Sequence, residues 1–289
     1  MDLDVSMSVT DAHRMREALA ALHDRVADYL NDCGMYPAKG SIARSEQEAW
    51  RGDSDDLFTA YSQGHLLLES ASDHAYGLTR LLTEPIQTIA PWTCVRATLE
   101  AAAYACWLLT KEINATERVA RSLAFRYMGL EQQLKTARCM SDHEFSADTL
   151  KRLDELQAEA ISLGYKVILD KVGKRISVAR LVPSATECIR SQLDGEVYYR
   201  ICSSMVHSHV SALIGLAFSA PDSSLPNELS KNLSPHAACW LLLRATDAFS
   251  HAVWARATLF GHDLHELTII LDGAYDSMNL GEAPRFWKV

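Results

Sequence analysis

An arginine, a serine and a histidine recur at helical spacing between residues 200 and 207. Arg200 and His207 are seven residues apart, and Ser203 lies between them. Because an α-helix turns by about 100° per residue, the three side chains are expected on one face. A guanidinium can hold a phosphate or carboxylate, and an imidazole can transfer a proton near neutral pH. The spacing therefore predicts a polar site, in which Ser203 orients the imidazole or binds substrate.

A second polar pair lies in the alanine-rich helical segment that begins at Trp92. Arg96 and Glu100 are four residues apart and therefore share a face. The segment around His207 is apolar enough to be buried, so its polar ridge needs a polar partner, which Glu100 could supply. Either these groups form a catalytic site, or they form an ion pair that fixes helix packing. The predicted catalytic residues are Arg96, Glu100, Arg200, Ser203 and His207.

A third polar pair interrupts the apolar helical segment between Pro235 and Phe260. Asp247 and His251 are four residues apart. Asp247 could orient His251 at the wall of a pocket, or reach Arg200, or pair with His251 at the edge of the core. A pocket inside the helices would hold a small molecule against aromatic side chains from Tyr104, Trp107, Trp240 or Trp254.

The sequence lacks the common motifs for nucleotides, hydrolysis and zinc. It contains no Gly-rich phosphate loop, no GxSxG, no HExxH and no zinc-type cysteine set. The acidic run from Asp53 to Asp56 is placed at an expected helix start, where carboxylates suit the helix dipole. We therefore expect no cofactor and no bound metal.

The composition indicates a globular protein that does not bind DNA. The 289 residues are 48% hydrophobic and 22% charged, and the net charge of −9 disfavours a general phosphate-binding surface. One basic segment, from Lys166 to Arg180, is the exception. RNA or a small anionic ligand remains a partner to consider.

The cysteines and the hydropathy pattern predict a cytoplasmic location. Seven cysteines are present without a CxxC pair, which suits a reducing compartment. The N-terminal residues are acidic where a signal peptide carries positive charge. No apolar run approaches the ~20 residues of a membrane span, so we expect no membrane association.

The helical period extends over nearly the whole chain. It predicts an all-α fold: a single domain over residues 1–289, built as a bundle of about seven to eight helices. Thr10 or Ser8 is expected to cap the first helix, Gly34 to end it, and Asn114 to cap a later one.

The sequence predicts insertions in this bundle and one helix that carries the polar residues. Residues 35–52 and 140–193 are predicted to be loop-rich or peripheral insertions. Alternation within 165–185 fits either a short hairpin or a loop. One helix, from about Gly195 to Phe218, would carry Arg200 and His207.

Two short motifs resemble known sequences. Arg96-Ala97-Thr98-Leu99-Glu100-Ala101 leading to Trp107-Leu108-Leu109, followed by the Tyr199–His207 stretch, resembles an uncharacterised family of all-helical bacterial proteins. A broader resemblance is to the HEPN superfamily, whose ribonuclease members carry an arginine and a histidine a few residues apart.

The HEPN resemblance implies a specific chemistry. Arg200 would stabilise the scissile phosphate and His207 would handle the 2′-hydroxyl proton, without metal, in a protein that forms a homodimer. The residues alone leave two alternatives open: an enzyme or binder for a small molecule held inside the bundle, and a structural interaction protein.

Overall fold

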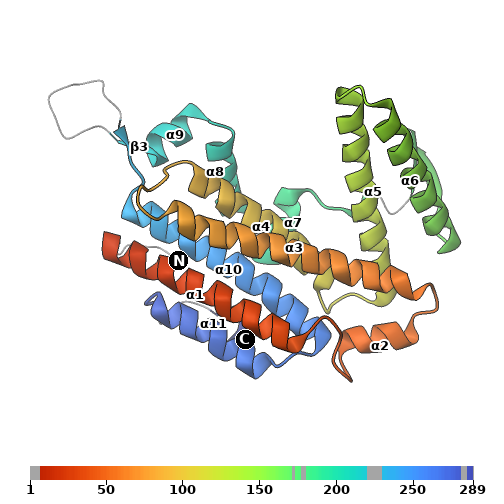
Figure 1. Cartoon of the computed structure of the whole chain (residues 1–289), viewed down its shortest axis with the longest axis horizontal. Coiled ribbons are helices and arrows are strands. Elements are labelled where there is room, and N and C mark those ends of the chain that lie inside the picture. Colours follow the sequence, from red (N-terminus) through yellow and green to blue (C-terminus); the bar gives the residue numbers. More distant parts are fainter. Residues whose placement is uncertain (1–6, 171–172, 177–179, 220–229, 281–284, 289) are drawn as a thin grey trace. The chain divides into compact units, whose positions relative to one another are not determined.

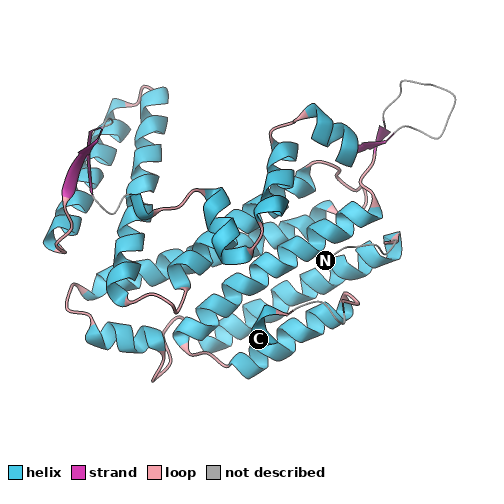
Figure 2. Ribbon diagram, turned by 180° about the vertical axis from the view of Figure 1, so that it is seen from behind, coloured by secondary structure: helices cyan, strands magenta, loops and turns pink. Residues whose placement is uncertain are grey.

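The structure is a computed structural model that describes residues 7–170, 173–176, 180–219, 230–280 and 285–288. Within these residues the regular structure is almost entirely helical, which confirms the all-α prediction (Figures 1 and 2). The described part of the chain contains eleven helices, more than the number predicted. They are α1 (Val9–Cys33), α2 (Ile42–Ala49), α3 (Ser54–Leu81), α4 (Ala90–Leu109), α5 (Ala115–Cys139), α6 (His143–Ser162), α7 (Ala185–Leu193), α8 (Glu196–Val206), α9 (Val210–Leu216), α10 (Pro235–Phe260) and α11 (Leu264–Ser277).

Two short strand pairs accompany the helices (Figure 2). Strands β1 (Val167–Asp170) and β2 (Gly173–Ile176) pair antiparallel, so the hairpin alternative describes this segment. Strands β3 (Phe218–Ser219) and β4 (Ser230–Lys231) form the second antiparallel pair. The side chains of residues 167–179, which include most of the predicted basic segment, lie outside the described residues.

The helix ends follow the capping residues that the sequence offers. Ser8 forms a capping box at the start of α1, and α1 ends immediately before Gly34. Asn114 caps α5 by accepting a hydrogen bond of 2.9 Å from the backbone N–H of Glu117. Local side-chain chemistry therefore sets these boundaries as predicted.

The additional helices α2 and α9 lie where the sequence predicted irregular structure or one longer helix. Segment 35–52 contains α2, and segment 140–193, predicted to be loop-rich or peripheral, contains α6, the β1–β2 hairpin and α7. The helix expected over 195–218 is interrupted, since α8 ends at Val206 and α9 begins at Val210. Ser208 has a φ of 54°, a left-handed conformation that an uninterrupted right-handed helix excludes.

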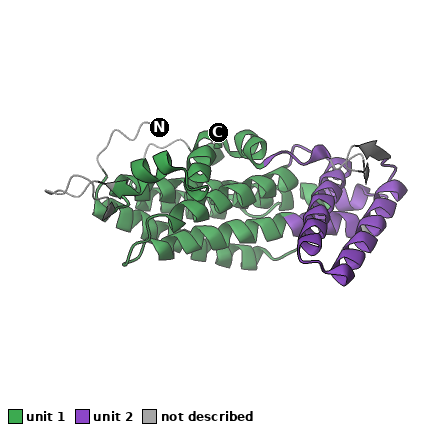
Figure 3. Cartoon of the chain, turned by 90° about the horizontal axis from the view of Figure 1, so that it is seen from above, with its two compact units in different colours: residues 1–44, 64–110, 185–289 green, residues 45–63, 111–184 purple. Residues whose placement is uncertain are grey.

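Contacts divide the chain into two compact units where the sequence predicted one domain (Figure 3). Unit 1 comprises residues 1–44, 64–110 and 185–289, and unit 2 comprises residues 45–63 and 111–184.

Unit 1 is built around α10, which packs against α1, α4 and α11 (Figure 1). Alanines on the buried faces of α4 and α10 let the two backbones approach closely. Helix α4 also packs against α7 and α8. Gly64 of α3 fits the same principle, because an added Cβ there would lie 2.5 Å from the Leu109 side chain of α4.

Unit 2 contains most of α2, the start of α3, α5, α6 and the β1–β2 hairpin. Helices α5 and α6 pack together, and Arg126 joins them through two hydrogen bonds of 2.6 and 2.9 Å to Glu159. Arg118 of α5 is completely buried and bonds Glu46 of α2 at 2.9 and 3.0 Å. A buried ion pair thus holds this unit together.

Candidate functional site

The predicted buried ridge on α8 does not exist. The Arg200 side chain is 66% exposed and pairs with Glu196 of its own helix at 2.7 Å. His207 is exposed and caps the C-terminal end of α8, and Ser203 is half-buried. The prediction that these three side chains face inward, opposite Glu100, is therefore wrong.

Tyr199 takes the inward position on α8 instead. It is 7% exposed and lies one residue before Arg200, which is about 100° around the helix. Because α8 carries apolar residues on most of its faces, the helical period alone does not determine which face is buried. Cys202 and Met205 continue the buried face three residues apart.

The predicted pair between Arg96 and Glu100 forms, at 3.0 Å, and its partner is Tyr199. Arg96 donates to the Tyr199 hydroxyl at 3.1 Å, and that hydroxyl donates to Glu100 at 2.7 Å. Burial raises the pKa of Tyr199, so the hydroxyl keeps its proton. The three groups bond to one another and join α4 to α8, while Nε of Arg96 is buried without a hydrogen-bond partner among the described residues.

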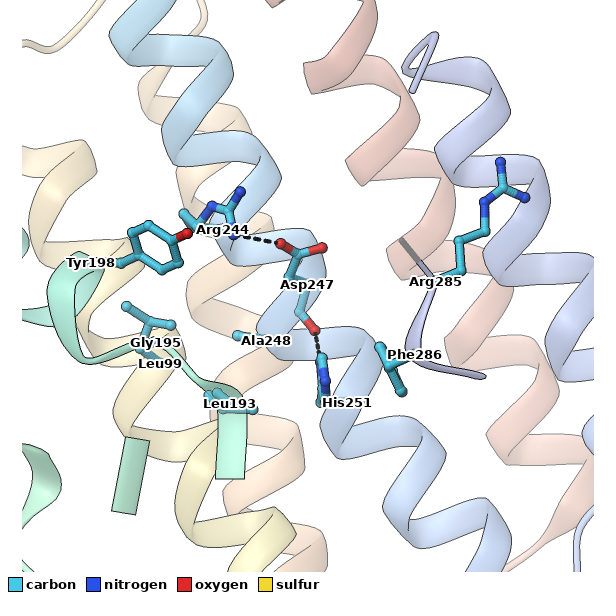
Figure 4. A pocket seen from close by; sticks show the side chains of 10 residues that line it. All are labelled: Leu99, Leu193, Gly195, Tyr198, Arg244, Asp247, Ala248, His251, Arg285 and Phe286. Atoms are coloured by element: carbon cyan, nitrogen blue, oxygen red, sulfur yellow. Dashed lines mark hydrogen bonds and ion pairs between the residues drawn. The ribbon is translucent and has the colours of Figure 1, made fainter. Parts of the chain in front are cut away.

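Unit 1 contains a cavity of about 330 Å³ between α4, α7, α8, α10 and the C-terminal turn, residues 285–288 (Figure 4). The cavity lies beside the hydrogen bonds between Arg96, Glu100 and Tyr199. Leu99 and Tyr198, which line the cavity, directly precede Glu100 and Tyr199 in the chain. Its lining is Leu99, Leu193, Gly195, Tyr198, Arg244, Asp247, Ala248, His251, Arg285 and Phe286. The cavity thus combines an apolar wall with an arginine, a carboxylate and an imidazole from α10.

Arg244 is the principal cation of this cavity. Its side chain is 14% exposed and its guanidinium lies over the Tyr198 ring, 4.2 Å from the centroid. Nη1 pairs with Asp247 at 3.0 Å, whereas Nε is buried without a hydrogen-bond partner among the described residues. Only part of the donor capacity of this guanidinium is therefore used by the protein.

Asp247 connects Arg244 to α11. Its carboxylate pairs with Arg244 through one oxygen and accepts a short hydrogen bond from the Tyr275 hydroxyl through the other. Burial raises the pKa of Asp247, while the charge of Arg244 opposes that rise. The carboxylate is thus held rigidly at the wall of the cavity.

His251 is oriented by the backbone rather than by the Asp247 carboxylate. Its Nδ1 lies 2.8 Å from the Asp247 carbonyl oxygen, one helical turn earlier. Because a carbonyl oxygen only accepts, Nδ1 carries the proton and the neutral ring keeps its lone pair on Nε2. Burial lowers the pKa of His251, which favours this neutral form. The ring stacks on Phe286 at a centroid distance of 3.5 Å.

The C-terminal turn closes one side of the cavity. Arg285 pairs with Asp272 and Asp276 of α11 at 2.7 and 2.5 Å, so its guanidinium is directed away from the other lining side chains (Figure 4). Trp287 also donates to Asp272, at 3.1 Å. These bonds hold Phe286 against His251.

Asp247 and His251 line the cavity, which agrees with one of the alternatives that the sequence left open for this face of α10. The sequence did not predict Arg244, Tyr198 and Arg285 as lining residues. Arg244 could have been found, since it precedes Asp247 by three residues on the same face. The aromatic lining predicted from Tyr104, Trp107, Trp240 or Trp254 is wrong, because the cavity is lined by Tyr198 and Phe286.

Unit 2 contains a second and more polar cavity, of about 560 Å³, at the start of α3. Its charged lining residues are Arg51, Asp53, Asp55, Asp56, Arg126 and Glu159. In the part of the chain that the structure describes, no three His, Cys, Asp or Glu side chains converge as metal ligands do. Asp55 and Asp56 lie in the first turn of α3, where carboxylates interact favourably with the helix dipole.

Two findings complete the description. Among the described helices, none has the length and hydropathy needed to cross a membrane. Neither a protein-family model, nor a curated protein, nor a solved structure matches this chain.

Proposed function

We propose that the unit 1 cavity binds a small, partly apolar molecule that carries a planar anionic group such as a carboxylate. The observation that carries this proposal is Arg244: a largely buried guanidinium lines the cavity, and Asp247 engages it through only one nitrogen. Arginine binds carboxylates through paired, charge-assisted N–H bonds. The guanidinium N–H groups that Asp247 does not engage are suitable donors for such a group.

The remaining lining suits the rest of such a ligand. Leu99, Leu193 and Phe286 provide apolar surface, as ligand pockets of this size usually do. His251 offers Nε2 as a hydrogen-bond acceptor or as a general base for a ligand hydroxyl. Titratable groups with shifted pKa values that converge on one cavity are typical of functional sites.

The pocket proposal is tested with 2-naphthoate and its neutral isostere 2-naphthamide, with binding measured by isothermal titration calorimetry. Replacing Arg244 with glutamine should weaken 2-naphthoate about 10-fold or more, because a charge-assisted hydrogen bond is lost. The affinity for 2-naphthamide should stay within about 3-fold of wild type, because that probe carries no charge.

Two further variants make the result specific. Leu193→Trp fills the cavity and should abolish binding of both probes, whereas Arg200→Gln removes an exposed arginine outside the cavity and should change neither affinity. Circular dichroism checks that each variant is folded. The pocket proposal is contradicted when 2-naphthoate does not bind the wild type, or binds Leu193→Trp equally well.

Metal-independent RNA cleavage is a second candidate function. It is favoured by the exposure of Arg200 and His207, since a polymer can reach both side chains. Val197 and Val210, on α8 and α9, are 65% and 69% exposed beside them. In this proposal a second copy of the chain covers the apolar residues and completes the site.

RNA cleavage is tested with a labelled single-stranded RNA in the presence of a metal chelator. Arg200→Gln and His207→Ala should each slow cleavage by about 100-fold or more, as expected for loss of an acid–base or phosphate-binding group. Their melting temperatures should equal that of wild type, because both side chains are exposed. RNA that remains intact with the wild-type protein would exclude this candidate.

A further inference from the structure

A second buried arginine of unit 1 lies outside the cavity. Arg256 of α10 is 1% exposed, and its Nη2 donates to the Gly34 carbonyl oxygen at 3.0 Å. The Phe260 ring lies 5.2 Å from the guanidinium carbon. Its Nε and Nη1 are buried and have no hydrogen-bond partner among the described residues. A buried cation with unsatisfied donors is costly, so it calls for an explanation.

The charge of Arg256 is only partly compensated by the protein. Gly34 follows the last residue of α1, so the guanidinium meets the partial negative charge of a helix C-terminus, equivalent to about half an elementary charge. No carboxylate lies within 4.0 Å of Arg256 in the described chain. The nearby Glu69 side chain is 55% exposed and lies beside His65, at 3.7 Å. Part of the positive charge of Arg256 is therefore not compensated by the protein.

Two imidazoles extend this donor-rich region. His262 is 8% exposed, and neither of its ring nitrogens has a partner in the described chain. His65 has a buried, unpartnered Nδ1. Burial lowers the pKa of both rings and the charge of Arg256 lowers it further, so both are neutral at pH 7 and can each donate one N–H.

The ring of His262 is fixed by its neighbours. It packs edge-on against Tyr29 and Phe260, at centroid distances of 6.3 and 5.7 Å. Gly261, in a left-handed conformation, places His262 directly after α10. The donors are thus held in position by packing rather than by hydrogen bonds to protein.

We propose that Arg256 and His262 form a binding site for a small inorganic anion of the size of chloride. Three properties indicate this class of ligand. Arg256 and His262 supply unpartnered N–H donors, the charge of Arg256 is only partly compensated, and both side chains are almost inaccessible to solvent. This burial favours a small ion over an organic anion, because the side chains of Arg256 and His262 are only 1% and 8% exposed. The site is separate from the Arg244 cavity and does not depend on the function proposed for it.

The test measures the melting temperature while sodium chloride replaces sodium gluconate at constant ionic strength. Wild type should show a saturable rise of about 3 °C, as expected for a ligand that binds only the folded state. Arg256→Met should remove this rise. Because that variant also loses the bond to Gly34, His262→Phe is the second variant, and it should raise the half-saturating chloride concentration several-fold. Arg200→Gln is the control and should respond like wild type.

The location is checked by bromide anomalous scattering from crystals grown in sodium bromide. A peak within hydrogen-bonding distance of Arg256 Nε or Nη1 supports the site. A buried water without anion preference would instead give equal melting temperatures in chloride and gluconate and no bromide peak. Either that result, or a chloride response that survives in both variants, overturns the proposal.

Discussion

Replacing Arg118 with methionine should lower the free energy of unfolding of unit 2 by about 3–5 kcal/mol, because it leaves the Glu46 carboxylate buried without its cation. Arg118 is completely buried, and Glu46 is 8% exposed. The pair is bidentate, at 2.9 and 3.0 Å, and Glu46 also accepts a hydrogen bond of 2.7 Å from Tyr61. Burial and the bond to Glu46 raise the pKa of Tyr61, so the hydroxyl remains a donor.

Amide hydrogen exchange in α5 is the appropriate measurement, because a chain with two compact units need not unfold in one step. Lys151→Met is the control. The Lys151 side chain is 75% exposed and pairs with Glu155 in α6 of the same unit, so loss of this ion pair should cost less than about 1 kcal/mol. A loss for Arg118→Met as small as that of the control would contradict the prediction.

A double variant distinguishes the buried charge from the lost packing. Arg118→Met combined with Glu46→Gln leaves no uncompensated charge and keeps an acceptor for Tyr61. It should therefore be more stable than Arg118→Met alone, despite having two substitutions. A double variant that is less stable than the single one would show that side-chain packing, not charge burial, dominates.

The all-α fold could be predicted because long amphipathic segments repeat their apolar residues many times. Helices such as α1 and α5 also begin at strong capping residues, Ser8 and Asn114. Helix α2 and the break between α8 and α9 could not be predicted in the same way. Helix α2 has only 8 residues between punctuating glycines and a proline, and the break at Ser208 involves neither glycine nor proline.

The candidate site shows where sequence reasoning fails. The Arg96–Glu100 pair depends only on spacing within one helix, and it forms as predicted. The inward direction of Arg200 depended on the phase of α8, an 11-residue helix with apolar residues around most of its circumference. A change of one residue in the phase of α8 places Tyr199, rather than Arg200, on the buried face. Arg285 reaches the cavity through the C-terminal turn, which no helical period can predict.

Lowering the pH from about 6.5 to about 4 should destabilise the protein through His262 by about 3 kcal/mol. Burial, and then the charge of Arg256, lower the pKa of His262 from 6.5 to about 4. In that pH range the unfolded chain binds a proton at this histidine and the folded chain does not, so acid favours unfolding. The shift of about 2.5 pKa units corresponds to that free energy, at 1.36 kcal/mol per unit.

Other groups titrate in the same range, so the contribution of His262 must be isolated by difference. The pKa values of His65 and His251 are also lowered by burial, and both act in the same direction. Asp247 and Asp56 have raised pKa values, so they add stability as the pH falls and act in the opposite direction. Subtracting the pH profile of His262→Phe from that of wild type removes these shared contributions.

The difference profile, measured by denaturant unfolding at low chloride, should be flat above pH 6.5 and fall toward pH 4. Chloride should make it shallower, because an anion beside His262 favours the protonated ring and raises its pKa toward the unfolded value. A profile that is flat throughout would show that His262 is hydrated rather than buried in solution. A steep profile that does not change with chloride would show that His262 is buried but that no anion binds beside it. The pH profile and the chloride titration thus report on the same pair of residues through independent measurements.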